Sequence, residues 1–91
     1  MSGLERIAGS LRSGRFAVAR LPDGSGVLLE VEGLRVLSLN ETGMAVLDAI
    51  GNGLTTTDGL VSELVRTFDV DEATARRDLE AFLAGLLRRV E

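Results

Sequence analysis

The sequence predicts an α+β fold, in which a three-stranded antiparallel sheet is followed by a three-helix winged helix-turn-helix unit. Two observations predict this fold. Apolar residues alternate with a period of two between residues 15 and 39, which is typical of strands. After Asn40 they recur every three or four residues, which is typical of amphipathic helices. Because the chain has only 91 residues, these segments are expected to share one core.

Three strands joined by short turns make up the predicted sheet. In the first strand Phe16 and Val18 fall on one face, and alanines fall on the other. A Pro-Asp-Gly-Ser-Gly turn and a Glu-Gly turn separate the strands, so we expect an antiparallel meander. Glu30 and Glu32 are expected on a solvent-facing side of this sheet. The strands are expected at residues 15–21, 26–32 and 35–39.

Three helices are predicted after the sheet, at residues 40–51, 56–68 and 71–89. Asn40, Thr56 and Asp71 are favoured N-cap residues, and a Gly-Asn-Gly sequence ends the first of these helices. One apolar stripe is expected to pack the last helix against the core. The residues of that stripe are Ala75, Leu79, Phe82, Leu86 and Val90.

Residues 1–14 are predicted to form a flexible or short helical N-terminal arm, set apart from a domain over residues 15–91. Leu4, Ile7 and Leu11 have helical spacing, but nearby glycines and serines weaken a helix. Residues 1–20 contain four arginines and one acidic residue. This basic stretch is either a solvated arm or a small patch that faces an anion.

The composition argues against catalysis. The chain has no cysteine and no histidine, which excludes disulfides, Cys/His zinc sites and nucleophiles that depend on those residues. The sequence from Asp69 to Glu72 lacks the glycine of a calcium loop. We therefore expect no catalytic residue, no metal and no cofactor, and hence no enzyme. There is no apolar run long enough for a signal peptide or a membrane span, so a cytoplasmic protein without membrane contact is expected.

The charge distribution argues against nucleic acid as a partner. The net charge is −4, and arginine and acidic residues balance within the last predicted helix. Since DNA affinity depends largely on cationic side chains, an acidic chain with a neutral long helix is a poor DNA reader. A winged-helix transcription regulator, or a general protein-interaction domain, remains the alternative hypothesis.

The third predicted strand is a candidate edge of the sheet. An extended peptide can add to such an edge, with affinity from main-chain hydrogen bonds and specificity from side-chain pockets. On the last helix, Leu83 and Leu87 add apolar surface beside the main stripe. They either line a groove next to the strand or complete the core, and composition does not separate these two readings.

Three sequence segments resemble the PqqD-like family, whose members are known as RiPP recognition elements and bind the precursor peptides of ribosomally made, modified products. The most specific segment is Leu39-Asn40-Glu41-Thr42-Gly43. The others are Phe68-Asp69-Val70-Asp71 and Asp78-Leu79-Glu80-Ala81-Phe82-Leu83. The resemblance covers roughly residues 15–91.

The resemblance implies a function and a site. It implies that the leader of a precursor peptide docks as an added strand, and that the domain delivers it to a modifying enzyme. That enzyme is often a radical SAM protein, as in pyrroloquinoline quinone biosynthesis. The family often has aromatic residues near positions 36 and 37, where this chain has Val and Leu. The implied peptide-binding residues are Arg35, Val36, Leu37 and Ser38 on the strand and Arg76, Leu79, Leu83 and Leu87 on the helix.

Overall fold

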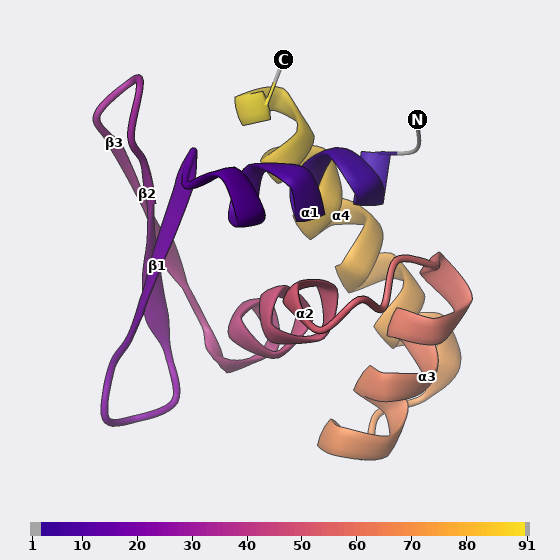
Figure 1. The fold of residues 1–91 in the computed structure, drawn as a ribbon. Helices are drawn as coiled ribbons and strands as arrows, with labels where there is room; N and C mark the ends of the chain where they lie inside the picture. The colour runs from indigo at the N-terminus through magenta and orange to yellow at the C-terminus, as the bar shows by residue number, and fades with distance from the viewer. Residues whose placement is uncertain (1–2, 91) are drawn as a thin grey trace.

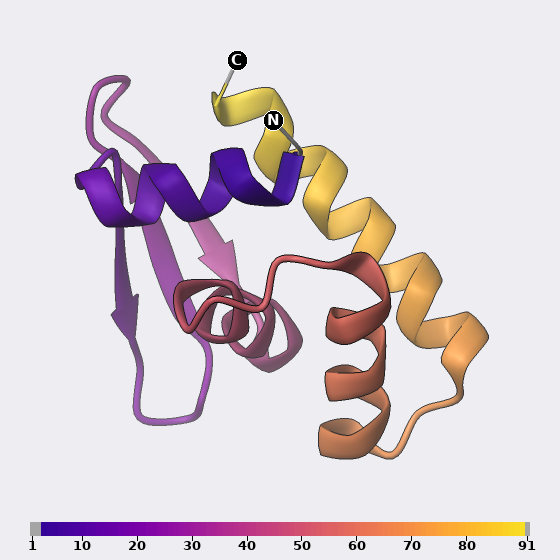
Figure 2. The same ribbon diagram turned by 45° about the vertical axis from the view of Figure 1, so that its right-hand side comes forward.

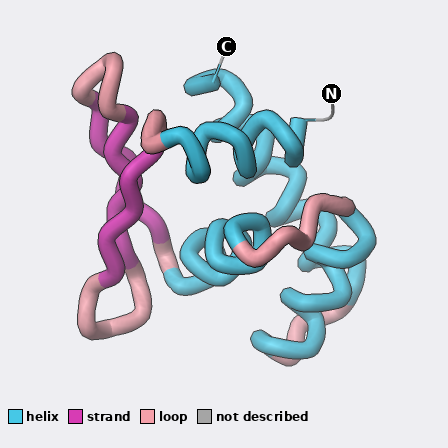
Figure 3. Tube along the Cα trace, viewed as in Figure 1, coloured by secondary structure: helices cyan, strands magenta, loops and turns pink. Residues whose placement is uncertain are grey.

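A computed structural model describes residues 3–90, with side chains through residue 88. These residues form an α+β fold (Figure 1), and its helices and strands are distinguished in Figure 3. The three strands form one antiparallel sheet in the order β1-β2-β3, as predicted. The elements are α1 (Gly3–Ser13), β1 (Phe16–Arg20), β2 (Gly26–Glu30), β3 (Arg35–Leu39), α2 (Glu41–Gly51), α3 (Thr57–Phe68) and α4 (Glu72–Val90).

The fold contains a helix before the sheet in addition to the three predicted after it. Of the two states left open for the N-terminal arm, residues 3–13 adopt the helical one. Ile7 is completely buried, and Leu4 and Ala8 are buried beside it. In Figure 2, α1 crosses in front of the sheet and extends toward α4. The description as a three-helix unit is therefore incomplete, because α1 is part of the same core.

All four helices lie on one side of the sheet (Figure 1). Phe16, Leu28 and Leu39 are buried on that side, one from each strand. Phe16 pairs with Glu30, and Glu30 pairs with Arg35, so these three residues form one row across the sheet. The remaining residues of the three strands pair in the same continuous register. Over residues 3–90, no helix packs against the other face of the sheet.

The prediction that Glu30 faces solvent is wrong. Glu30 is buried, and its Oε1 accepts a hydrogen bond of 3.1 Å from Nη2 of Arg35. Its Oε2 is buried without a hydrogen-bond partner among the described residues. Glu32 does lie at the surface, where Arg15 is its ion-pair partner at 3.8 Å. The two glutamates differ because β2 ends at Glu30, so the strand alternation does not continue to Glu32.

The predicted N-caps are confirmed by their hydrogen bonds. The Asn40 side chain accepts from the Gly43 N–H at 2.8 Å, and Thr56 accepts from the Gly59 N–H at 3.2 Å. Asp71 accepts from the Thr74 N–H at 2.8 Å. Each cap satisfies a backbone donor that the first turn of a helix leaves free, which fixes where α2, α3 and α4 begin.

The core lies between the helices and the helix-facing side of the sheet. Leu28, Leu79 and Leu86 are among its most buried side chains. The predicted stripe on α4 is partly wrong, because Phe82 is only half-buried while Leu83 belongs to the core. Val90 lies outside the described side chains. The buried face of α4 is therefore rotated away from Phe82 toward Leu83.

The Asp71 cap is expected to make stability depend on acidic pH. Hydrogen bonds from the Thr74 side chain and backbone lower the pKa of Asp71 below its ordinary value of 3.8. A lowered carboxyl pKa stabilises the folded state above the unfolded pKa, and this contribution is lost as pH falls through the folded pKa. In Asp71→Asn, the side chain still caps the helix but no longer titrates. We expect a shallower fall of the melting temperature in Asp71→Asn than in the original chain below about pH 4. If the melting temperatures of the two proteins fall equally steeply below about pH 4, this expectation is contradicted.

Candidate functional site

The outer edge of β3 is an open edge of the sheet. β3 pairs with β2 on one side, and among the described strands none pairs with its other side. Val36 is 64% exposed, and Arg35 and Ser38 are also exposed. Such an edge presents unpaired backbone N–H and C=O groups to which another strand can bond. β1 is the second edge of the sheet.

A hollow of about 340 Å³ lies where β3 runs into α2. One wall comes from the start of α2 and the other from one flank of α4. Both polar and apolar side chains line it, so it can accept a side chain of mixed character. The lining residues are Asn40, Thr42, Gly43, Val46, Asp78, Leu79, Ala81 and Phe82.

Gly43 permits the close approach of the two walls. A Cβ atom at this position would lie 3.0 Å from Cε1 of Phe82, which is tighter than ordinary van der Waals contact. The backbone N–H of Gly43 is held by the Asn40 cap at the same place. The segment Leu39-Asn40-Glu41-Thr42-Gly43 therefore ends the edge strand, begins α2 and forms one wall of the hollow.

The four predicted strand residues divide between the two faces of β3. Val36 and Ser38 lie on the face without helices, because they alternate with the buried Leu39. Leu37 is half-buried on the helix side and packs against the core. Arg35 also lies on the helix side, where its guanidinium is bonded to Glu30. All four belong to the edge strand, and alternate residues among them direct their backbone groups to the open edge.

Of the three predicted leucines of α4, Leu79 lines the hollow between α2 and α4, and Leu83 and Leu87 do not. Leu79 and Leu83 both belong to the core. Leu87 is half-buried and packs against α1, since a Cβ at Gly3 would lie 2.9 Å from Cδ1 of Leu87. Of the two readings left open for Leu83, core packing is the one that the structure has.

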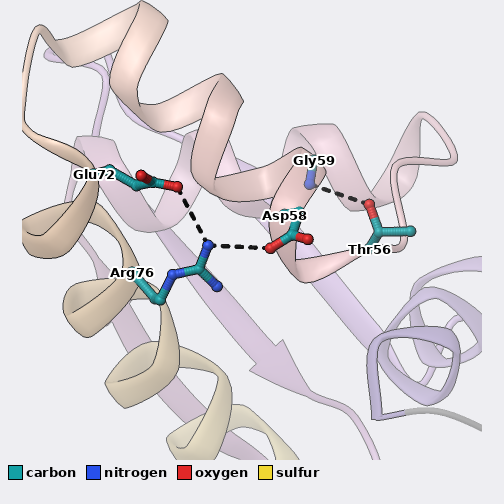
Figure 4. A network of polar contacts seen from close by, with 5 residues as sticks. All are labelled: Thr56, Asp58, Gly59, Glu72 and Arg76. Carbon is teal, nitrogen blue, oxygen red and sulfur yellow. Dashed lines mark hydrogen bonds and ion pairs between the residues drawn. The ribbon is translucent and has the colours of Figure 1, made fainter.

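Arg76 lies on the side of α4 that faces α3 (Figure 4). Its Nη2 is 3.1 Å from Oδ1 of Asp58 on α3 and 3.5 Å from Oε1 of Glu72. The hydrogen bond to Asp58 is the main cause that raises the pKa of the Arg76 guanidinium. The structure therefore separates Arg76 from the other predicted residues, and its local role is to join α4 to α3.

The predicted site residues did not include Asp78, Ala81 and Phe82 of α4, which the structure brings to the hollow, although all three lie in a segment that resembles the PqqD-like family. Asp78 and Phe82 are four residues apart, so they share one flank of the helix. Which flank of α4 lines the hollow depends on where α2 packs against α4. The spacing of apolar residues along α4 does not show this. For the other wall, the sequence did contain a signal: the strand ending at Leu39 is followed at once by the N-cap residue Asn40.

The N-terminal arginines gather at a second hollow, of about 690 Å³, on the surface of α1. Arg6 and Arg12 line it together with Arg15, and Glu5 lies among them. Arg15 is paired with Glu32, so part of this basic charge is already balanced.

Over residues 3–90, no group of three or more potential metal-ligating side chains comes together. No helix in that part of the chain combines the length and apolarity that crossing a bilayer requires.

Comparison with known proteins adds a family. The family model described as Coenzyme PQQ synthesis protein D (PqqD) matches residues 25–89. No curated protein and no solved structure matches the chain significantly. The matched segment contains β2, β3 and the three helices that follow, including both walls of the hollow, but neither α1 nor β1. Because this segment is well over half of the 91 residues, the chain belongs to the PqqD family.

Proposed function

We propose that this chain binds the leader region of a ribosomally made precursor peptide by strand addition at β3. It presents that peptide to a modifying enzyme, often a radical SAM protein, in biosynthesis of the pyrroloquinoline quinone or RiPP type. The chain itself acts without catalysis and without a cofactor.

One observation carries this proposal: the open edge of β3 leads directly into the hollow between α2 and α4. An added strand takes main-chain hydrogen bonds from the edge, and its alternate side chains point toward the helix side. There they meet the half-buried Leu37 and, at the end of the strand, the hollow beside Phe82. One bound strand could therefore use the backbone groups of β3 and the hollow at the same time.

β3 is favoured over β1 as the docking edge for two reasons. The hollow adjoins the end of β3. The segment shared with the PqqD family includes β3 but stops short of β1. A surface that serves the family's common function is expected within the shared segment.

The use of the fold as a DNA-binding winged helix-turn-helix has less support. The Arg76 guanidinium is engaged by Asp58 and Glu72, so it is not free to contact phosphate. With a net charge of −4, the chain is expected to repel a nucleic-acid backbone. A titration with duplex DNA at low salt is expected to give no saturable binding, whereas the leader peptide binds.

A pair of alanine substitutions on α4 tests the site. Ala81 lines the hollow, Ala73 lies outside it, and both are exposed within the same helix. We expect Ala81→Glu to weaken leader binding by about tenfold or more, because the carboxylate must lose water when a peptide docks. Ala73→Glu adds the same charge to the same helix and is expected to bind like the original chain. Equal affinities for the two variants, measured by calorimetric titration, would argue against the hollow as part of the site.

A further inference from the structure

The helix α1 carries arginines that no acidic side chain neutralises. Most arginines whose side chains the structure describes form ion pairs with a glutamate or an aspartate. Within residues 3–88, Arg6, Arg12 and Arg88 lack such a partner, and two of these three lie on α1. Because acidic residues outnumber arginines in this chain, an arginine without an ion pair is the exception. The uncompensated positive charge is therefore concentrated on α1.

The arginines of α1 lie on its outward side, around the hollow of about 690 Å³. The inward side of α1 is buried in the core around Ile7. Gly9 lies halfway between Arg6 and Arg12 in the sequence, and nothing lies within 4 Å of the position that a Cβ would take there. The space between the two arginines is therefore open to a partner. We call Arg6, Arg12 and Arg15, which all line this hollow, the basic cluster.

We infer that the basic cluster docks an acidic segment of the modifying enzyme that receives the peptide. The inference rests on the proposed function, because a presenting protein needs a surface for the enzyme that is separate from its peptide site. The hollow of the basic cluster is lined only by residues between 5 and 15, and it shares no residue with the hollow beside β3. Residues 5–15 also lie outside the segment that matches the PqqD family, so they can suit a partner particular to this chain.

The charge distribution favours a short acidic segment of a protein over a nucleic acid. Residues 1–20 carry a charge of +3, which leaves −7 on residues 21–91 of the net −4. A long polyanion would meet that negative remainder, whereas a short acidic segment needs to contact only α1.

The position of the basic cluster also disfavours a small free anion. Arg12 lies in the last turn of α1, where the unsatisfied backbone carbonyls repel a compact anion at the helix surface. Arg6 and Arg12 are separated by about 9 Å along the helix axis. Carboxylates spread along a segment can meet both arginines at the tips of their side chains.

Enzyme docking and leader binding are expected to differ in their dependence on salt. The guanidinium group of Arg12 is exposed, and attraction between exposed charges is screened beyond about 10 Å at 0.1 M salt. We therefore expect the affinity for the enzyme to fall steeply as salt is raised, while the affinity for the leader changes little.

Titration of the full, peptide-free chain with the modifying enzyme encoded beside its gene tests this inference. Arg12→Glu is expected to weaken enzyme binding about tenfold at low salt, mainly through slower association. Arg66→Glu is the matched control, because Arg66 is also an exposed arginine in the last turn of a helix, and it is expected to bind like the original chain. Arg12→Lys keeps the charge and is expected to keep the binding. Inorganic phosphate at matched ionic strength is expected not to compete.

Leader titration of the same variants separates this inference from the proposed function. Arg12→Glu is expected to bind the leader like the original chain and to keep its folded circular dichroism spectrum. The inference is overturned if the original chain does not bind the enzyme, if Arg12→Glu and Arg66→Glu bind it equally well, or if phosphate competes. Enzyme binding that depends on Arg12, together with no leader binding by the original chain, would count against the proposed peptide site and not against the basic cluster.

Discussion

Proline at one of two neighbouring positions in β3 is expected to abolish leader binding while the domain stays folded. Val36 pairs with Leu29 and Leu37 pairs with Leu28 in the register with β2. Successive backbone N–H groups of a strand point to opposite sides, so only one of Val36 and Leu37 directs its N–H to the open edge. Proline there removes a donor that an added strand needs, and its ring obstructs the partner strand.

The loss of affinity in the proline variant distinguishes binding by strand addition from binding through side chains alone. The loss is expected to be about 100-fold in affinity, the equivalent of about 3 kcal/mol. Proline at the other position removes a bond to β2 and is expected to lower the stability of the sheet instead. Val36→Ala and Leu37→Ala keep their N–H groups and serve as controls for the lost side chains. If each proline variant binds as well as its alanine counterpart, the peptide does not add as a strand to β3.

Leu86→Ala is expected to lower stability more than Phe82→Ala does, and Phe82→Ala is expected to weaken leader binding more than Leu86→Ala does. Leu86 is completely buried, so its truncation is expected to cost about 2–5 kcal/mol of unfolding free energy. That is a large part of the roughly 5–15 kcal/mol available to a domain. Phe82 is half-buried against Gly43, so Phe82→Ala is expected to cost less stability. Because its ring forms a wall of the hollow, Phe82→Ala is expected to weaken leader binding more than Leu86→Ala does.

Denaturant titration of the two variants, with leader titration of each under conditions where it is folded, provides the comparison. A larger loss of stability for Phe82→Ala than for Leu86→Ala would show that the buried face of α4 is centred on Phe82 after all.

The features of the fold that local sequence determines were predictable. The period-two pattern, the turns and the caps at Asn40, Thr56 and Asp71 act over a few residues, and they are found where they were expected, except that β2 ends at Glu30 and not at residue 32. The helix α1 was harder to predict, because glycine and serine weaken it as an isolated helix. Its stability comes from the burial of Ile7 among residues distant in sequence.

The errors in the candidate site have a geometric origin. Phe82 and Leu83 are adjacent on α4, so a rotation of one residue decides which of them faces the core. That rotation depends on where α1, α2 and α3 pack, which the spacing of apolar residues does not contain. Glu30 was misplaced for a similar reason, since its partner Arg35 comes from the neighbouring strand.

Calorimetric titration of the chain with the leader of a precursor peptide encoded near its gene tests the central claim most directly. The account predicts saturable one-site binding that depends only weakly on salt, because main-chain hydrogen bonds and apolar contacts provide most of the affinity. It also predicts that the proline variant at the open edge loses this binding and stays folded. No detectable binding at high micromolar concentration, with the modifying enzyme also present, would contradict the peptide-presenting function and favour a general interaction domain.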